Sequence, residues 1–189
     1  MKIKILRKSL ENAPIMNKGK YQYVIHPLTD GIPEIKPILL EEVTNRMLEI
    51  VKKYENIDKI VTIEAMGIPL ATALSLKMNI PFSIIRKRKY GLDNEIIVEQ
   101  KTGYSNSKLY LNGFKEGEKI IIVDDVLSTG GTLKAVLKTL IKIGVIVKCV
   151  IITIDKGNSV EEIIENNNID IYTLAKINVK KGKTIIRKI

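Results

Sequence analysis

IIIVDDVLSTGGT, residues 120–132, is the stretch that decides the fold of this chain. Its first four residues are apolar and β-branched without alternation, which is typical of a parallel strand buried on both faces. Two adjacent carboxylates follow, Asp124 and Asp125, and a turn of small residues then leads into an amphipathic helix. In α/β proteins ligands bind where such strands end, at the carboxyl edge of the sheet. We therefore expect the ligand site at this junction.

The residues of this junction fit a ribose that carries a 5′-phosphate. Adjacent carboxylates can accept hydrogen bonds from vicinal hydroxyls or hold a hydrated divalent cation. The turn offers backbone N–H groups, hydroxyls and glycines without Cβ atoms at the start of a helix, which together form a phosphate cradle. An ordinary turn with a polar N-cap is the alternative, but adjacent acids at the end of a buried strand cost stability unless they bind something. The cradle consists of Ser128, Thr129, Gly130, Gly131 and Thr132.

The cradle differs from two common phosphate loops. It lacks the Gly-Lys-Ser/Thr ending and the upstream glycine of a Walker motif, and it is not a dinucleotide fingerprint. The stretch resembles instead the phosphoribosyl pyrophosphate signature of the type I phosphoribosyltransferase family. This resemblance implies that Asp124 and Asp125 hold the ribose hydroxyls and that residues 128–132 bind the 5′-phosphate. It also implies an α/β fold, in which helices flank a central, mostly parallel sheet, with a small hood and a flexible lid loop.

Helical and strand patterns alternate along the chain, which predicts one domain with a parallel sheet and right-handed crossovers. A short helix over 159–165 is indicated by the capping-box spacing of Ser159 and Glu162, and Gly144 closes the preceding helix. The other expected helices span residues 37–54, 67–78 and 132–143, and the expected strands span 59–63, 82–86, 119–124, 145–154 and 171–174.

Two segments interrupt this alternation. Residues 1–37 contain four prolines and short runs of mixed polarity, which suit a small cap, or hood, better than the sheet. Residues 90–117 form a long polar excursion with several glycines, and loops of this length in a compact domain are usually functional lids or disordered. We expect a single domain over 1–189, with the hood at 1–37 and a flexible lid at 90–117.

Composition narrows the class of protein. The 189 residues are 45% apolar, which is enough for one real core. The one cysteine, Cys149, lies in an apolar run, so a disulfide framework and a cysteine metal site are excluded. No stretch approaches 18 uninterrupted apolar residues and the first residues do not open a signal peptide, so we expect a soluble, cytoplasmic protein that contacts no membrane.

The formal net charge of +10 has three interpretations. Nucleic-acid binding is disfavoured because the lysines are scattered and aromatic residues make up only 5% of the chain, without Trp. A polyanionic small substrate would also benefit from a basic cleft. Background composition rich in Ile and Lys is the third interpretation.

VTIEAMGIP, residues 61–69, is a second strand-to-helix junction with a glycine for close backbone approach. A plain βα turn is the alternative. The segment resembles the pyrophosphate loop of the family, and this implies that Ala65, Met66 and Gly67 bind the pyrophosphate through backbone N–H groups. Adenine-binding relatives often have Arg at the position of Met66.

The basic run RKRK, residues 86–89, follows an expected strand. A solvated face is the usual explanation of such a run. Alternation aims Arg86 and Arg88 one way and Lys87 and Lys89 the other. The run lies where the family places cations that meet the pyrophosphate, and we favour Arg86 and Lys87 as these contacts.

Within the expected lid, Tyr104 and Ser105 resemble a segment that closes over the reaction centre in the family. Closure would exclude water and complete the anion clamp. Adenine-specific relatives often carry Glu immediately before this Tyr. The residue here is Gly103, which argues against adenine.

Lys156 follows an expected strand at the carboxyl edge of the sheet, where a lysine is often only a surface residue. Xanthine and hypoxanthine–guanine enzymes of the family place a Lys at this point, against the exocyclic oxygen of a 6-oxopurine. An ammonium group can donate but not accept a hydrogen bond, so it suits a carbonyl group.

His26, the only histidine, precedes a proline in the cap, and we interpret it as structural.

The resemblance is strongest to the archaeal-type hypoxanthine/guanine enzymes of the family, with the xanthine enzymes next. It implies purine salvage: hypoxanthine, and with it guanine, reacts with phosphoribosyl pyrophosphate to give IMP or GMP and pyrophosphate. It also implies a homodimer and Mg²⁺ that is held by the substrate, with contacts to Asp124 and Asp125 through water. Ser128 stands where many relatives carry an Asp that assists proton transfer, so the general base stays open.

Three alternatives remain at this point. One is a non-catalytic regulator that senses phosphoribosyl pyrophosphate, although no helix-turn-helix pattern is evident. Another is transfer to adenine or orotate. The third is a preference for xanthine, since the choice among 6-oxopurines depends on contacts from the cap and from the tail after Leu174.

Overall fold

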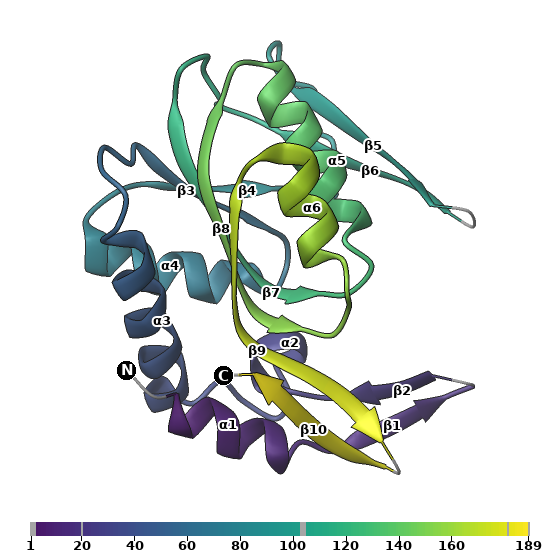
Figure 1. Ribbon diagram of the computed structural model, residues 1–189. Helices are drawn as coiled ribbons and strands as arrows, with labels where there is room; N and C mark the ends of the chain where they lie inside the picture. Colours follow the sequence, from purple (N-terminus) through teal and green to yellow (C-terminus); the bar gives the residue numbers. More distant parts are fainter. Residues whose placement is uncertain (1–2, 20, 103–104, 181, 189) are drawn as a thin grey trace.

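The computed structural model describes residues 3–19, 21–102, 105–180 and 182–188. A six-stranded sheet forms its centre, in the order β10-β9-β8-β7-β3-β4 (Figure 1). Five strands are parallel, and β10 pairs antiparallel with β9. The sheet consists of β3 (Lys59–Ile63), β4 (Phe82–Ile85), β7 (Lys119–Leu127), β8 (Ile146–Asp155), β9 (Asp170–Lys180) and β10 (Lys183–Lys188).

Helices cover both faces of this sheet (Figure 1). On one face lie α3 (Pro37–Val51) and α4 (Gly67–Met78), and on the other lie α5 (Gly131–Lys142) and α6 (Val160–Asn167). Among the described residues, no helix is long and apolar enough to cross a membrane. The expected fold class, an α/β fold with a mostly parallel central sheet between helices, is confirmed.

The apolar run of β7 is buried on both faces, as its lack of alternation predicts. Ile121 and Val123 belong to the core beneath α3 and α4, while Ile120 and Ile122 belong to the core beneath α5. All four side chains are fully buried. Burial of this kind is worth roughly 1.5–3 kcal/mol per side chain, so β7 anchors the two cores and fixes the position of the carboxylates that follow.

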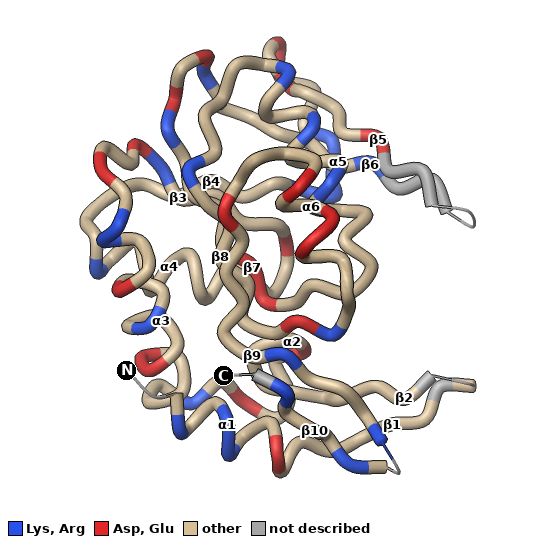
Figure 2. Tube along the Cα trace, viewed as in Figure 1, with Lys and Arg blue, Asp and Glu red and all other residues tan. Residues whose placement is uncertain are grey.

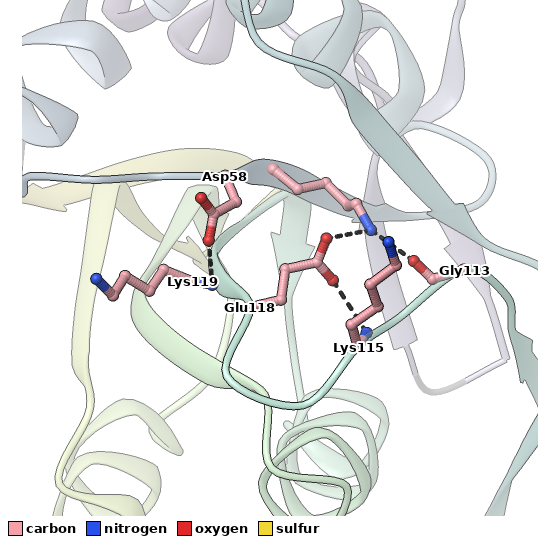
Figure 3. A network of polar contacts seen from close by, with 6 residues as sticks. Asp58, Gly113, Lys115, Glu118 and Lys119 are labelled. Carbon is pink, nitrogen blue, oxygen red and sulfur yellow. Dashed lines mark hydrogen bonds and ion pairs between the residues drawn. The ribbon is translucent and has the colours of Figure 1, made fainter.

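A polar network fixes β7 against β3 at the edge of the sheet opposite the carboxylates (Figure 3). Lys59 Nζ lies 2.6 Å from Glu118 Oε1 and donates a hydrogen bond to the carbonyl oxygen of Gly113 at 2.6 Å. The backbone N–H of Lys119 donates to Asp58 Oδ2 at 2.8 Å. These contacts set the register of the two strands, and the register places the loops after β3 and β7 side by side at the other edge.

The first part of the chain caps one end of the sheet. It forms α1 (Lys4–Glu11), the hairpin of β1 (Ile15–Lys18) and β2 (Tyr21–Val24), and the short α2 (Pro27–Asp30). Figure 1 shows these elements beside the far ends of β9 and β10, so both ends of the chain contribute to this region, which we call the hood. Leu6 and Leu10 of α1 are fully buried against α3.

The long excursion over 90–117 contains a β-hairpin, which the sequence analysis did not expect; the prediction that this segment closes as a lid stays a prediction. Strands β5 (Ile96–Thr102) and β6 (Ser105–Leu111) pair antiparallel, and β5 packs against α5. The buried side chains are Val98, Leu109 and Leu111. The apolar residues of the two strands are confined to paired segments at 96–98 and 109–111, and the mostly polar residues between these segments concealed the strands in the sequence.

Two strand ends and one helix cap differ most from expectation. Strand β7 continues through Leu127 and β9 through Lys180, because pairing with β8 and β10 holds residues that look polar or mixed in the sequence. The capping box at Ser159 is also wrong: within the described structure its side chain makes no capping hydrogen bond, and Ser159 Oγ instead donates to the carbonyl oxygen of Ser128 at 3.4 Å.

Candidate active site

Asp124 and Asp125 lie in the last third of β7, near the carboxyl edge of the sheet. Both line a cavity of about 460 Å³ together with Thr132 of α5. Two lysines, Lys87 and Lys108, line the same cavity from the side of the hairpin. The cavity therefore combines two carboxylates with two ammonium groups, an arrangement that suits a ligand carrying hydroxyls at one place and anionic groups at another.

The two carboxylates are held at an electrostatic cost. Burial raises the pKa of Asp124 well above its usual value, and the neighbouring charge of Asp125 raises it further. Burial also raises the pKa of Asp125. The backbone N–H of Asp125 donates to Asp124 Oδ1 at 3.0 Å and offsets part of this cost. Adjacent buried acids are typical of functional sites, because a fold has no structural reason to keep them.

The loop after β3 lies directly against Asp124. A Cβ atom added to Gly67 would stand 1.9 Å from Thr62 Oγ1 and 2.7 Å from Asp124 Oδ1, so only glycine fits there. Helix α4 begins at this residue, and its first N–H groups lack partners within the helix. The peptide bond between Glu64 and Ala65 is cis. The structure thus brings Ala65, Met66 and Gly67 beside the carboxylates, as the sequence analysis expects.

The turn after β7 packs closely against the loop that follows β8, whereas its own polar side chains are exposed. Gly130 has a φ of +74°, and an added Cβ would stand 2.8 Å from Ser159 Oγ. Gly157 packs so closely that a Cβ there would lie 1.9 Å from the carbonyl oxygen of Ser128. The side chains of Ser128, Thr129 and Thr132 are exposed. With α5 starting at Gly131, this geometry is that of an anion cradle at a helix N-terminus.

The basic run separates into two sides, as alternation predicts. The guanidinium carbons of Arg86 and Arg88 lie 5.9 and 5.8 Å from the ring centre of Tyr90. Arg86 Nε also lies 2.9 Å from Glu64 Oε2, whereas Lys87 lines the cavity. Of the two cations favoured from the sequence, Lys87 therefore lies where it could contact an anion in the cavity. Arg86 instead forms an ion pair with Glu64 in the loop after β3.

A second cavity, of about 380 Å³, lies between the turn at residues 128–132 and the hood, and we call it the hood cavity. Lys156 lines it, and Lys156 Nζ donates to the carbonyl oxygen of Val24 at 3.5 Å. Burial lowers the pKa of Lys156, while the carboxylates of Asp30 and Asp125 raise it. The remaining lining comes from the two regions that the sequence analysis expects to contact a base, the cap and the tail after Leu174: Gln22, Tyr23, Val24, Ile177, Asn178 and Val179, besides Ser128.

The sequence analysis did not single out Lys108 or Asn178, which line the two cavities, and the structure does not test the two expected lid residues. Lys108 belongs to the hairpin that was interpreted as a loop, and Asn178 lies in the part of β9 beyond the expected strand. No alternation within 105–111 marks Lys108 in the sequence. Tyr104 lies outside the described residues, and Ser105 begins β6 with a side chain that also lies outside them.

His26 has a structural role, as expected. It is fully buried, and its Nδ1 accepts a hydrogen bond from the backbone N–H of Leu28 at 3.2 Å, which caps α2. The ring proton is therefore on Nε2, which donates to Ser9 Oγ at 2.9 Å. Burial lowers the pKa of His26 to about 4, and the charge of Lys156 contributes.

This lowered pKa makes a prediction about stability. The unfolded chain binds a proton at His26 near the usual histidine pKa of 6.5 but the folded chain only near pH 4, so stability is lost as the pH falls between these values. The loss amounts to roughly 3 kcal/mol at its full extent. Urea unfolding between pH 7 and 4 should show a shallower decline for His26→Asn, which keeps a capping acceptor but does not titrate. Equal slopes would contradict this assignment.

The residues present fit a divalent cation only as a partial site. Among the described residues, no group of three or more His, Cys, Asp or Glu side chains could hold a metal ion. Mg²⁺ usually keeps several waters and takes one or two carboxylates together with substrate phosphates. Asp124 and Asp125 offer that pair of carboxylates in the cavity, so the site fits a Mg²⁺ ion that arrives with a phosphorylated substrate.

Comparison with known proteins agrees with this geometry. The family model described as a phosphoribosyl transferase domain matches residues 34–179, which include β7, its turn and the loop after β3. The chain belongs to the phosphoribosyltransferase family. The resemblance found in residues 120–132 is thereby confirmed.

Members of the phosphoribosyltransferase family resemble this chain over almost its whole length. The hypoxanthine/guanine phosphoribosyltransferase of Methanohalobium evestigatum is 52% identical over 184 residues, which cover 97% of this chain and 95% of the relative. The protein of the same name from Methanocaldococcus infernus is 51% identical over 182 residues, covering 96% and 99%.

Solved phosphoribosyltransferase structures share the fold. The adenine phosphoribosyltransferase of Saccharomyces cerevisiae superposes with a TM-score of 0.75 at 18% identity, covering 91% of this chain and 97% of its own. The adenine phosphoribosyltransferase of Thermoanaerobacter pseudethanolicus gives a TM-score of 0.74 at 21% identity, covering 92% and 99%. At these identities the likeness concerns the fold alone.

Proposed function

We propose that this chain transfers the phosphoribosyl group of phosphoribosyl pyrophosphate to a 6-oxopurine, hypoxanthine or guanine, in purine salvage. The products are IMP or GMP and pyrophosphate. The observation that carries the proposal is the pair Asp124 and Asp125 between two N–H-lined loops, with Lys156 in the adjoining cavity. The names and the 52% and 51% identities of the two archaeal relatives support the choice of base.

Each part of the donor substrate has a matching part of the site. The two carboxylates accept hydrogen bonds from the ribose 2- and 3-hydroxyls, and the turn at residues 128–132 holds the 5-phosphate. The loop at residues 65–67 and Lys87 hold the pyrophosphate, which lies in the cavity with the carboxylates. This arrangement fixes the anomeric carbon between the leaving group and the base cavity, so that geometry and electrostatics lower the barrier.

The reaction exchanges one bond at the anomeric carbon for another. The bond to the pyrophosphate oxygen breaks and its electron pair leaves with the pyrophosphate, while the bond to the purine N9 forms and the N9 proton passes to solvent. Positive charge develops on the ribose as pyrophosphate departs, and Asp124 and Asp125 stabilise it. Mg²⁺, bound through the substrate and water, would neutralise charge on the leaving pyrophosphate.

The 6-oxo group of the base is recognised by Lys156. Its ammonium group lies in the hood cavity and is only weakly bonded, at 3.5 Å, to the protein itself. Replacement by Met keeps the aliphatic stem but removes the donor. We expect Lys156→Met to reduce kcat/KM for hypoxanthine by about 10²-fold, since a charged hydrogen bond contributes roughly 1.5–3 kcal/mol.

Steady-state kinetics with hypoxanthine and with phosphoribosyl pyrophosphate as the varied substrates will check this. The KM for the base should rise while that for the donor stays within about twofold, since Lys156 contacts only the base. Lys142→Met, which removes an exposed lysine at the end of α5, is the matched control. An unchanged base KM in Lys156→Met would remove the argument for a 6-oxopurine.

The proposed function is tested by assaying the purified chain with radiolabelled hypoxanthine, guanine, xanthine, adenine and orotate. Hypoxanthine and guanine should be converted to nucleotides, and adenine and orotate should not. Absence of turnover with every base, together with tight DNA binding, would favour the non-catalytic regulator and contradict the proposed enzymatic function.

Family resemblance also supports a cytoplasmic homodimer, for which sedimentation should give twice the chain mass of 21.3 kDa.

A further inference from the structure

The far end of β9 carries a polar side chain into the hood cavity beside Lys156. Lys176 and Asn178 share one face of β9, because side chains alternate along a strand. Lys176 Nζ lies 3.4 Å from Asp155 Oδ2, at the residue before Lys156, which shows that this face looks toward the end of β8. Asn178 lies two residues further along β9 and lines the hood cavity together with Ser128 and Lys156.

A β-bulge aims an arginine at Asn178. The pairing of β10 with β9 shifts register between Ile186 and Lys188, so Arg187 is the extra residue of the bulge. Bulges re-aim side chains, and they are frequent beside active sites. In the amide orientation that satisfies both groups, Asn178 Oδ1 accepts from Arg187 Nη2 at 2.7 Å and from Arg187 Nε at 3.1 Å.

This pairing decides what Asn178 can offer to a ligand. A carbonyl oxygen has two lone pairs, and the guanidinium group uses both. The amide nitrogen donates one hydrogen to the carbonyl oxygen of Ile177 at 2.7 Å and has a second hydrogen left. As a residue that lines the cavity, Asn178 can therefore offer a ligand a donor and not an acceptor, because Arg187 occupies the amide oxygen.

We propose that Asn178, locked by Arg187, determines which base is accepted at the C2 edge of the purine. The inference rests on the proposed function, because Lys156 must take the 6-oxo group for Asn178 to face the opposite side of the six-membered ring. A donor there matches the 2-oxo group of xanthine, or the ring nitrogen N3 that hypoxanthine and guanine share. It mismatches the 2-amino group of guanine, which is itself a donor. The site thus favours hypoxanthine over guanine.

Two substitutions of similar shape test the proposal independently. Asn178→Asp replaces the donor by a carboxylate that can accept from a 2-amino group while keeping Arg187 as its partner. We expect the hypoxanthine-to-guanine ratio of kcat/KM to fall roughly tenfold, the effect of one hydrogen bond exchanged for a mismatch, and use of xanthine to fall as well. Arg187→Gln releases the amide, and the same ratio should fall in the same direction.

The readouts separate recognition from folding and from the proposed function itself. The change should appear in the KM of the base and leave the KM of phosphoribosyl pyrophosphate unchanged, and Lys183→Gln, which removes another cation of β10, should leave the base ratio as it is. Thermal unfolding will confirm that the variants are folded, and if one of them is not, the other decides. Unchanged base ratios in the folded variants would overturn the proposal. Absence of turnover in the wild-type chain would instead overturn the proposed function.

Discussion

The double substitution Asp124→Asn/Asp125→Asn should abolish phosphoribosyl transfer and leave the protein folded. Asn is close to Asp in shape but carries no charge, so the pair could no longer stabilise the positive ribose or accept both hydroxyl hydrogen bonds as strongly. We expect kcat to fall by about 10³-fold or more, the scale seen when fixed electrostatic groups are removed from an active site. Full activity of this variant would refute the assignment of the site.

The same variant should be more stable than the wild type at neutral pH. Burial raises the pKa of both carboxyl groups in the folded chain above the usual aspartate value of 3.8. A raised pKa means that these groups favour folding only while protonated, so their contribution is lost as the pH rises from about 4 through the folded pKa. Thermal unfolding at pH 7 should therefore give a higher Tm for the variant, with the difference shrinking at acid pH.

A matched control separates this effect from a general loss of negative charge. The variant Glu161→Gln/Glu165→Gln removes two exposed carboxylates from α6 and should change neither kcat nor the pH dependence of Tm. A lower Tm for the Asp124→Asn/Asp125→Asn variant at pH 7 would contradict the view that these acids are kept for function at the expense of stability.

Gly67→Ala should cause the second large loss. The added methyl group would collide with Thr62 Oγ1 at 1.9 Å and with Asp124 Oδ1 at 2.7 Å. Thr62 is fully buried and cannot move aside, whereas Asp124 can be displaced into the cavity that it lines. We expect a loss of about 1–3 kcal/mol in the free energy of unfolding from overpacking. Displacement of Asp124 should also lower kcat/KM by about 10²-fold.

A second substitution separates the two collisions. Thr62→Ala removes Oγ1 but leaves Asp124 in place, so Gly67→Ala/Thr62→Ala should recover most of the lost stability while activity stays low. Thr62→Ala alone is the control, and urea unfolding and initial rates are the measurements. Wild-type activity in Gly67→Ala would show that the loop after β3 does not need to approach Asp124 closely.

The parts of the fold that the sequence predicts well are those fixed by local pattern. The bounds of β3 and α4 match the expected 59–63 and 67–78, because an apolar run and an Ala- and Leu-rich segment meet there at a glycine. The burial of β7 on both faces follows from its uninterrupted β-branched residues. The turn at residues 128–132 was also predictable, because the two acids, the glycines and the start of the following helix are all local features of the sequence.

The parts that the sequence did not predict depend on contacts between distant residues. The hairpin of β5 and β6 is stabilised by the packing of Val98 and Leu109 near α5, which no local pattern reveals. The orientation of Asn178 depends on a bulge in another strand, at Arg187. Ser159 has the spacing of a capping residue, but its hydroxyl donates to Ser128 because tertiary structure brings that carbonyl oxygen within reach.

Product analysis of the purified chain with hypoxanthine, phosphoribosyl pyrophosphate and Mg²⁺ tests the central claim most directly. Chromatography for the nucleotide and an enzymatic assay for pyrophosphate would be run on the same samples over time. The proposed function predicts that IMP and pyrophosphate appear in equal amounts, and that neither appears with Asp124→Asn/Asp125→Asn. Release of pyrophosphate without IMP, or recovery of both substrates unchanged, would contradict it.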